Sequence, residues 1–532
     1  MSFQTEIPTP IDIIMANGGV GSGYVLETTS FDWAGLDAAV SRVVQKWRLL
    51  AARVVFEGSV SWSFYLSRTL GSHLTIHSVD KAYVLRIPVG DLGNSFKTHT
   101  FTTRRFDHPL PISLPVSSDS LKLYPIYLTD YFIVAGGNMS MSDYSISQAP
   151  LLSLHITYFD NVTCVGIEGP HGVFDGIGFG LVLEAIEAEL AGRSWEIPRL
   201  DTSKCFADAT KDLPSAALGE EGDGGRLPDT MIPATVVSAK KERPPPPPLI
   251  VFKNIFIGDN IVAKWKEESK EMLSKEGDGS FVSTGDLLAA WLTKAAFNKP
   301  PPNTDTIIMK TIFDIRPTLS TPSLDLTRYP HNMMSAFDIS VSLSTLSSLP
   351  LATLAKAHRQ AIIKYRNRAY VKSFLDFLTS DGFPPASPER STWILFSNQT
   401  SAKLVIDLKE KLVGFEKFVL PVGPVAPVNS SINKVGKGWV LCAALPKERW
   451  GSVEGVLREM GAEIESPSLR PALYVTMKRR RTDDSVDLAA VRVAAPKAAT
   501  SLRQAAERRI KPKSQASLHV IAWRCRIPNC SL

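Results

Sequence analysis

The sequence predicts an α/β (α+β) protein with two domains, each of them a mixed sheet flanked by helices. In the first half of the chain, residues 163–167 have the composition of a buried strand, and apolar residues recur at helical spacing over residues 178–190. The same order returns later, because a strand is predicted over residues 250–256 and a helix over residues 259–273. The chain has 532 residues, of which 44% are hydrophobic, and this is enough for two cores of about 200 residues each.

Composition divides the chain into four parts. A break over residues 201–249 separates a first domain, residues 1–200, from a second domain, residues 250–470. Residues 244–248 within this break are all proline. Such a run favours a stiff polyproline II rod, which we interpret as a spacer in a linker rather than as a ligand for an aromatic groove. Residues 471–532 form a basic tail that we expect to be disordered.

The net charge of +6 originates in this tail. Residues 478–532 hold 13 Lys and Arg against 4 Asp and Glu, a surplus of +9 that leaves the rest of the chain at −3. A uniformly basic face for nucleic acid is therefore not indicated, and we expect no nucleic-acid partner. The basic run 478–481 leaves a nuclear signal or a polyanion patch as the alternative.

The chain lacks the sequence features of a membrane or secreted protein. It has no run of about 18 apolar residues, and its N-terminus has neither the basic nor the apolar region of a signal peptide. We therefore expect no membrane span and a cytoplasmic location. The five cysteines are scattered without paired metal-ligand spacing, which fits a reducing compartment and predicts no metal site.

His171 and Asp175 form the most informative pair, because they lie where the predicted strand over 163–167 gives way to the predicted helix. A neutral imidazole has an ordinary pKa of about 6.5, so it can take a proton from an alcohol and later return one to a leaving group. Asp175 either holds the tautomer of the ring or fixes the turn by pairing with a distant cation, and the spacing leaves both roles open. Gly176 and Gly178 let the backbone approach closely near a bound ligand.

Three other motifs do not predict a site. His73 and His77 lie in a segment with the alternation of a strand, where four residues span about 13 Å, too far to share one metal ion. The glycines of residues 18–23 do not match a dinucleotide or phosphate loop, so we interpret that stretch as a flexible turn. No Gly-x-Ser-x-Gly elbow is present, which argues against an α/β-hydrolase.

Several separated segments match the motifs of one enzyme family in order. They are Pro10-Ile11-Asp12, the amphipathic run 36–53 that ends in Trp47-Arg48-Leu49-Leu50-Ala51-Ala52-Arg53, the His171 motif, the helix start at 282–291, Asp314-Ile315-Arg316-Pro317, and Tyr329-Pro330-His331-Asn332. The sequence thus resembles the BAHD-type (HxxxD) CoA-dependent acyltransferases, especially their fungal secondary-metabolism branch, over residues 8–465. Ala52 and His331 stand where that family usually has glycine.

One family motif is poorly matched. The family usually carries a serine-tryptophan pair and then an aspartate-phenylalanine-glycine-tryptophan-glycine motif late in its second domain. Here residues 397–400 lack the tryptophan, and residues 406–409 keep only the aspartate, Asp407. In the family the second motif is largely structural, so its loss bears on stability and domain contact more than on mechanism. A catalytically inactive binding member is the alternative that this departure leaves open.

The resemblance implies a fold and a set of roles. It implies two chloramphenicol-acetyltransferase-like domains with a solvent tunnel between them, and His171 as the general base within it. By the same resemblance, Asp175 points away from the substrates and pairs with Arg316, while Gly176 supplies close backbone packing. Ser283 and Thr284, at a helix start where backbone donors can meet a phosphate or an amide, are candidates for CoA contacts. Asn332 is a further candidate, near the thioester.

The resemblance also implies a function. We expect an O-acyltransferase that moves an acyl group, by default acetyl, from acyl-CoA to a hydroxyl of a small secondary metabolite such as a terpenoid, polyketide or alkaloid. We expect a monomer with no permanently bound cofactor. An N-acyltransferase, or a condensation-type domain of peptide assembly, is the alternative within the superfamily. Pro170 stands where a condensation domain generally has a second histidine, which favours a free CoA substrate.

Overall fold

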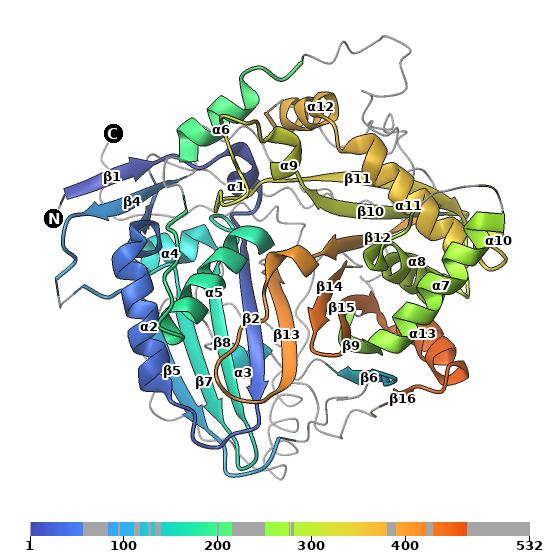
Figure 1. The fold of residues 1–532 in the computed structure, drawn as a ribbon, viewed down its shortest axis with the longest axis horizontal. Helices are drawn as coiled ribbons and strands as arrows, with labels where there is room; N and C mark the ends of the chain where they lie inside the picture. The colour runs from blue at the N-terminus through green and yellow to red at the C-terminus, as the bar shows by residue number, and fades with distance from the viewer. Residues whose placement is uncertain are drawn as a thin grey trace, which may run out of the picture. The chain divides into compact units, whose positions relative to one another are not determined.

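The computed structural model describes residues 2–464 apart from 57–82, 94–95, 111–117, 126–128, 134–139, 199–201, 215–249, 276, 278–280, 380–389 and 422–428. The chain divides into two compact units, Met1–Pro467 and Ser468–Leu532, and the described residues all belong to the first. They form sheets of five, eight and three strands, flanked by helices (Figure 1). The predicted α/β fold class is confirmed.

The five-stranded sheet carries the predicted catalytic segment. Its strand order is β13 (Leu412–Pro421), β2 (Gly18–Leu26), β8 (Thr163–Pro170), β7 (Ser153–Tyr158) and β5 (Thr100–Arg105). All neighbours are antiparallel except β7 and β5. Its helices are α2 (Trp33–Lys46) and α5 (Gly176–Leu190), which pack on each other. Nearby, a small sheet is formed by β1 (Ser2–Glu6), β4 (Val84–Val89) and β3 (Arg53–Val55).

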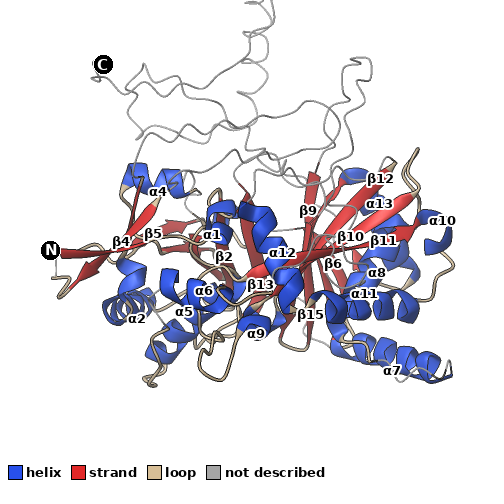
Figure 2. Ribbon diagram, turned by 90° about the horizontal axis from the view of Figure 1, so that it is seen from above, coloured by secondary structure: helices blue, strands red, loops and turns tan. Residues whose placement is uncertain are grey.

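All strands of the eight-stranded sheet except one come from residue 250 onward. Its strand order is β11 (Met334–Ser342), β10 (Thr306–Asp314), β12 (Ser391–Asn398), β14 (Asn429–Val435), β15 (Gly438–Pro446), β9 (Ile250–Gly258), β6 (Leu121–Pro125) and β16 (Glu463–Ile464). α7 (Asp259–Lys275), α8 (Thr284–Phe297) and α11 (Leu351–Tyr365) lie along this sheet (Figure 2). Buried side chains of α8 and α11 meet those of the sheet in one apolar core.

Shorter elements complete the described part of the chain. They are α1 (Pro10–Ile14), α3 (Thr129–Phe132), α4 (Met141–Ser147), α6 (Thr202–Thr210), α9 (Arg316–Leu319), α10 (Leu343–Leu346), α12 (Arg368–Thr379), α13 (Lys447–Glu459), and two 3₁₀ turns, Arg48–Ala51 and Thr400–Ala402.

The two large sheets exchange strands. β6 comes from the first half of the chain but pairs with β9 in the eight-stranded sheet. β13 comes from the second half but pairs with β2 in the five-stranded sheet. The sheets therefore do not follow the predicted boundaries at residues 200 and 250, and the division into two domains stays a prediction.

Local signals placed the main elements correctly. The predicted strands 163–167 and 250–256 lie within β8 and β9, and the predicted helices 178–190 and 259–273 lie within α5 and α7. Asp175 caps α5 by accepting a hydrogen bond from the backbone N–H of Gly178, so the helix starts two residues earlier than its apolar spacing indicates.

Within the amphipathic run 36–53, α2 ends at Lys46 and a 3₁₀ turn leads into β3. Two expectations need correction. The stretch 18–23 is not a flexible turn but part of the buried strand β2, where a side chain on Gly23 would collide with the ring of Phe132 at 2.6 Å. The start of the predicted linker is helical, since α6 places Cys205 and Ala209 in an apolar core.

Other predicted features fall outside the described residues. They include His73, His77, the proline run and the basic tail. Within the described part of the chain, no helix is long and apolar enough to cross a membrane. The same residues contain no group of three or more His, Cys, Asp or Glu able to hold a metal ion.

Candidate active site

His171 lies on a short turn between β8 and α5. Its backbone N–H donates to the carbonyl of Gly18 at 2.7 Å, which ties the turn to the start of β2. The side chain is buried, and its Nδ1 has no hydrogen-bond partner among the described residues. Burial, and then the nearby charge of Lys417, lower the pKa of the ring to about 4. The imidazole is therefore neutral at physiological pH, which is the state that a general base requires.

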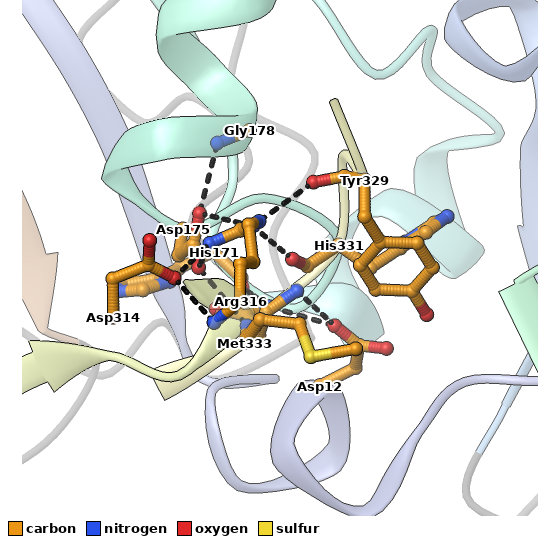
Figure 3. Close-up of polar contacts among 10 residues, drawn as sticks. Asp12, His171, Asp175, Gly178, Asp314, Arg316, Tyr329, His331 and Met333 are labelled. Carbon is orange, nitrogen blue, oxygen red and sulfur yellow. Dashed lines mark hydrogen bonds and ion pairs between the residues drawn. The ribbon is translucent and has the colours of Figure 1, made fainter. Parts of the chain in front are cut away.

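Asp175 faces Arg316 rather than the imidazole (Figure 3). The two guanidinium nitrogens donate to the two carboxylate oxygens at 3.0 Å each, in a bidentate ion pair. The same carboxylate accepts the backbone N–H of Gly178 at 2.8 Å and of Met333 at 3.0 Å. Of the two roles that the spacing left open, the structure has the pairing with a distant cation, as the resemblance implies.

Arg316 uses all five of its N–H donors. Besides Asp175, it donates to the carboxylate of Asp314 at 2.9 Å and to the carbonyls of Tyr329 at 3.0 Å and His331 at 2.6 Å (Figure 3). The side chain is 1% exposed. Burial disfavours its charge, but the two carboxylates keep its pKa above the ordinary value. Arg316 therefore has no donor left for a substrate, and it joins the turn of His171 to the segment after β10.

Asn332 braces the same turn from a second side. Its Nδ2 donates to the backbone carbonyl of His171 at 2.8 Å and to Oδ1 of Asp12 at 2.7 Å, and its backbone N–H donates to that same oxygen at 3.0 Å. Asn332 is 0% exposed, and both amide hydrogens are in use. The structure thus places this predicted CoA contact behind His171, as a support of its backbone. Burial raises the pKa of Asp12 to about 6.

The close packing expected of Gly176 occurs at its neighbours instead. A Cβ at Gly176 would lie 3.5 Å from Gln399, which is an ordinary contact. A Cβ at Gly178 would lie 1.7 Å from the carbonyl oxygen of Pro330, and one at Gly180 would lie 1.6 Å from that of Ala402. The role predicted for Gly176 is therefore corrected, because α5 approaches other backbone segments two and four residues further into the helix.

The predicted CoA contacts lie at the start of α8. Ser283 caps this helix, and its hydroxyl bonds the carboxylate of Asp286 at 2.7 Å, so that hydroxyl is already used; Thr284 is the first helical residue. Asp286 also bonds Nδ1 of His358 at 2.7 Å, and Nε2 of His358 lies 2.9 Å from the hydroxyl of Thr311. This Asp–His–Thr order resembles a hydrolase triad, but all three side chains are buried and tie α8, α11 and β10 together.

One buried charge near His171 escaped the sequence analysis. Lys417 on β13 is 4% exposed, and its Nζ has no hydrogen-bond partner among the described residues. No motif marks this position. The only signal in the sequence is an adjacent glutamate and lysine, Glu416 and Lys417, inside a strand of mainly apolar residues, and such charged residues are usually solvated. Its location follows from the pairing of β13 with the five-stranded sheet.

The fold and the site together define a class. This chain has the fold of the CoA-dependent acyltransferases of the BAHD type, with a histidine and an aspartate at the turn between β8 and α5. It aligns over 86% of its length with F. sporotrichioides TRI101, solved in complex with coenzyme A and T-2, at a TM-score of 0.59 and 12% identity, covering 98% of that chain. It aligns with vinorine synthase at a TM-score of 0.52 and 12% identity, covering 86% of this chain and 93% of the other.

Sequence relatives agree with this class. The O-acetyltransferase PaAT-2 of Phomopsis amygdali is 23% identical over 355 residues, which cover 62% of this chain and 69% of that protein. The acetyltransferase pyiB of Pyricularia grisea is 23% identical over 359 residues, covering 63% and 68%. No protein-family model matches the chain. The predicted resemblance to fungal acyltransferases is confirmed by these relatives and by the fold.

Proposed function

We propose that this protein is an acyl-CoA-dependent O-acyltransferase that transfers an acyl group, by preference acetyl, to a hydroxyl of a secondary metabolite. The observation that carries the proposal is the buried, neutral imidazole of His171, whose Nδ1 lacks a partner among the described residues and whose turn is fixed from two sides. Relatives named as acetyltransferases and O-acyltransferases support it. A monomer located in the cytoplasm, as expected from the sequence, completes the proposal.

The reaction needs one proton carrier and no covalent enzyme intermediate. His171 takes the proton of the acceptor hydroxyl as its oxygen attacks the thioester carbonyl carbon, and the carbonyl oxygen gains the negative charge of a tetrahedral intermediate. When this intermediate collapses, the carbon–sulfur bond breaks and the imidazolium returns the proton to the CoA sulfur. Burial and the charge of Lys417 lower the pKa of His171, which favours that return of the proton.

Several buried side chains hold the turn of His171 in place, and the energetics of catalysis explain why its position matters. A positioned base contributes about 10²- to 10⁴-fold, whereas holding reactants in line supplies about 7 to 11 kcal/mol. Asp175 with Arg316 fixes the end of the turn, and Asn332 with Asp12 fixes the carbonyl of His171 itself. We assign both pairs to positioning of the base rather than to contact with substrate.

The proposal also covers the residue that contacts the acyl-CoA donor and the class of acceptor. Thr284, at the first turn of α8, remains our candidate for a CoA contact, because the N-terminus of a helix offers backbone donors to phosphate or amide oxygens. The acceptor is proposed by analogy with relatives such as the O-acyltransferase pboC of Aspergillus ustus. The tunnel between two domains stays a prediction.

The experiment is thiol release from acetyl-CoA by the purified full-length protein, with and without a panel of alcohols. We expect the wild-type protein to release thiol faster than His171→Ala by about 10²- to 10⁴-fold. His108→Ala, a histidine on a turn of the five-stranded region, serves as the matched control and should retain full activity. Equal rates for wild type and His171→Ala, with both proteins folded by circular dichroism, would overturn the proposal.

A further inference from the structure

Lys417 is held between the two large sheets. On β13 it stands opposite Ser22 of β2, and β13 also contacts β14 and β15 of the eight-stranded sheet. Figure 1 shows β13, in orange, lying between β2 and β14. The ammonium lies 5.5 Å from the centre of the Phe179 ring. Phe179 belongs to the first turn of α5, where its N–H donates to the carbonyl of Asp175. The head of Lys417 is thus close to the helix that follows the turn of His171.

The titratable groups around Lys417 come from several elements. Burial lowers the pKa of Lys417 to about 7, opposed by the Cys442 thiol of β15 and by the Asp175 carboxylate at the N-terminus of α5. In return, the charge of Lys417 lowers the pKa of His171. The charge of Glu416, which precedes Lys417 on β13, raises the pKa of the Cys442 thiol. Lys417 therefore lies within electrostatic range of the proposed base, and its ammonium and amine forms coexist near neutral pH.

A row of polar side chains crosses the eight-stranded sheet beside Lys417. Ser431, Cys442 and Asn254 are direct register partners on β14, β15 and β9, so they lie on one face. Their chain neighbours, such as Leu441, belong to the apolar core of the other face. The hydrogen bond from Nδ2 of Asn254 to the carboxylate of Glu416 on β13, at 3.5 Å, places this row on the face toward β13.

Two buried polar atoms at the His171 end of the site lack partners among the described residues. They are Nζ of Lys417 and Nδ1 of His171. Buried polar atoms in proteins are nearly always hydrogen-bonded, so two unpartnered ones on adjoining elements indicate a place where a polar ligand binds. A structural cation in this protein is satisfied differently, since Arg316 donates to two carboxylates and two carbonyls.

We infer, on the basis of the proposed function, that Lys417 is a further catalytic residue, whose ammonium donates a hydrogen bond to the thioester carbonyl oxygen as that oxygen becomes negatively charged. The acceptor oxygen forms its bond to the carbonyl carbon, His171 holds the proton, and Lys417 stabilises the oxyanion without transferring a proton. When the carbon–sulfur bond breaks, the oxyanion returns to a carbonyl and the CoA thiol leaves with the proton from His171. Nζ of Lys417 has no hydrogen-bond partner among the described residues of the free protein, so it is available to donate to the oxyanion in the transition state.

The test is Lys417→Met in the full-length protein, because methionine keeps much of the length of the side chain and removes the charge. We expect kcat for thiol release from acetyl-CoA to fall by about 10²- to 10³-fold, the usual loss when one oxyanion donor is removed. KM for acetyl-CoA should stay within about threefold, since the donor acts on the transition state more than on bound substrate. The melting temperature should rise, because an unpaired buried amine is replaced by an apolar group.

The pH profile separates catalysis from structure. The ammonium is lost as pH rises through about 7, so wild-type kcat should decline on the alkaline side, and Lys417→Met should lack that decline. In the same variant the pKa of His171 should rise, because one of the charges that lowers it has gone. Lys264→Met, an exposed lysine of α7, is the matched control and should change neither kcat nor the profile.

Three outcomes would overturn the inference. If Lys417→Met keeps wild-type kcat and pH profile while His171→Ala is inactive, Lys417 has no catalytic role and the proposed function stands. If kcat and melting temperature fall together with an unchanged profile, Lys417 is structural. If the wild-type protein releases no more thiol than His171→Ala, the proposed function fails, and the role of Lys417 fails with it.

Discussion

The ion pair between Asp175 and Arg316 offers the most direct test of how the site is held. In Arg316→Ala, the carboxylate of Asp175 keeps only the N–H groups of Gly178 and Met333, and the carbonyls of Tyr329 and His331 lose their donor. Removing one partner of a buried pair typically costs about 3 to 5 kcal/mol, because an uncompensated charge stays buried. We expect a loss in this range, a large share of the roughly 5 to 15 kcal/mol by which proteins are stable.

Urea unfolding followed by tryptophan fluorescence and circular dichroism measures this loss. The double variant Asp175→Asn with Arg316→Met should be less destabilised than the sum of its single changes, since it removes the charge of Asp175 together with that of its partner. Arg458→Ala removes a surface pair with Glu454 and should cost about 0.5 kcal/mol or less. A cost below about 1 kcal/mol for Arg316→Ala, with normal thiol release, would refute the view that this pair holds the turn of His171.

The remaining predictions concern packing and the tail. Gly178→Ala should destabilise the protein by about 1 to 3 kcal/mol and lower turnover, because its methyl group would meet the carbonyl of Pro330 at 1.7 Å. Gly176→Ala, whose methyl group would meet only Gln399 at 3.5 Å, should be neutral or slightly stabilising; equal melting temperatures for the two variants would contradict this account. Ending the chain before residue 478 should leave thiol release unchanged, and a large loss would mean that the tail belongs to the active protein.

The sequence predicted the outline of the site because the patterns that mark the strand and the helix beside His171 are local. The composition of a buried strand before His171 and the helical spacing after it require only neighbouring residues, and they correctly predicted β8 and α5. The resemblance added the pairing of Asp175 with Arg316 across 141 residues of chain. Neither source revealed that Asn332 supports the backbone of His171, because the full burial of that side chain depends on how α1 and the segment after β10 meet.

The errors share one cause. Glycines of β2 were interpreted as a turn, since nothing in the local sequence shows that Phe132 packs against Gly23. The sequence predicts close backbone approach at both Gly176 and Gly178, but only Gly178 has it, because the approaching segment at Pro330 is distant in the chain. In each case the neighbour that decides the role of the residue lies far away in the chain.

The sequence by itself determined the fold class, the order of the elements around His171 and the prediction of an imidazole as base, because strand and helix patterns and side-chain chemistry are properties of short segments. Only the tertiary structure decided that β6 and β13 change sheets, and hence that Lys417 is buried near His171 with no hydrogen-bond partner among the described residues. Which sheet a strand joins depends on the alternative long-range pairings open to it and on which of its faces becomes buried. The packing of the whole chain decides this, not the residues of one strand.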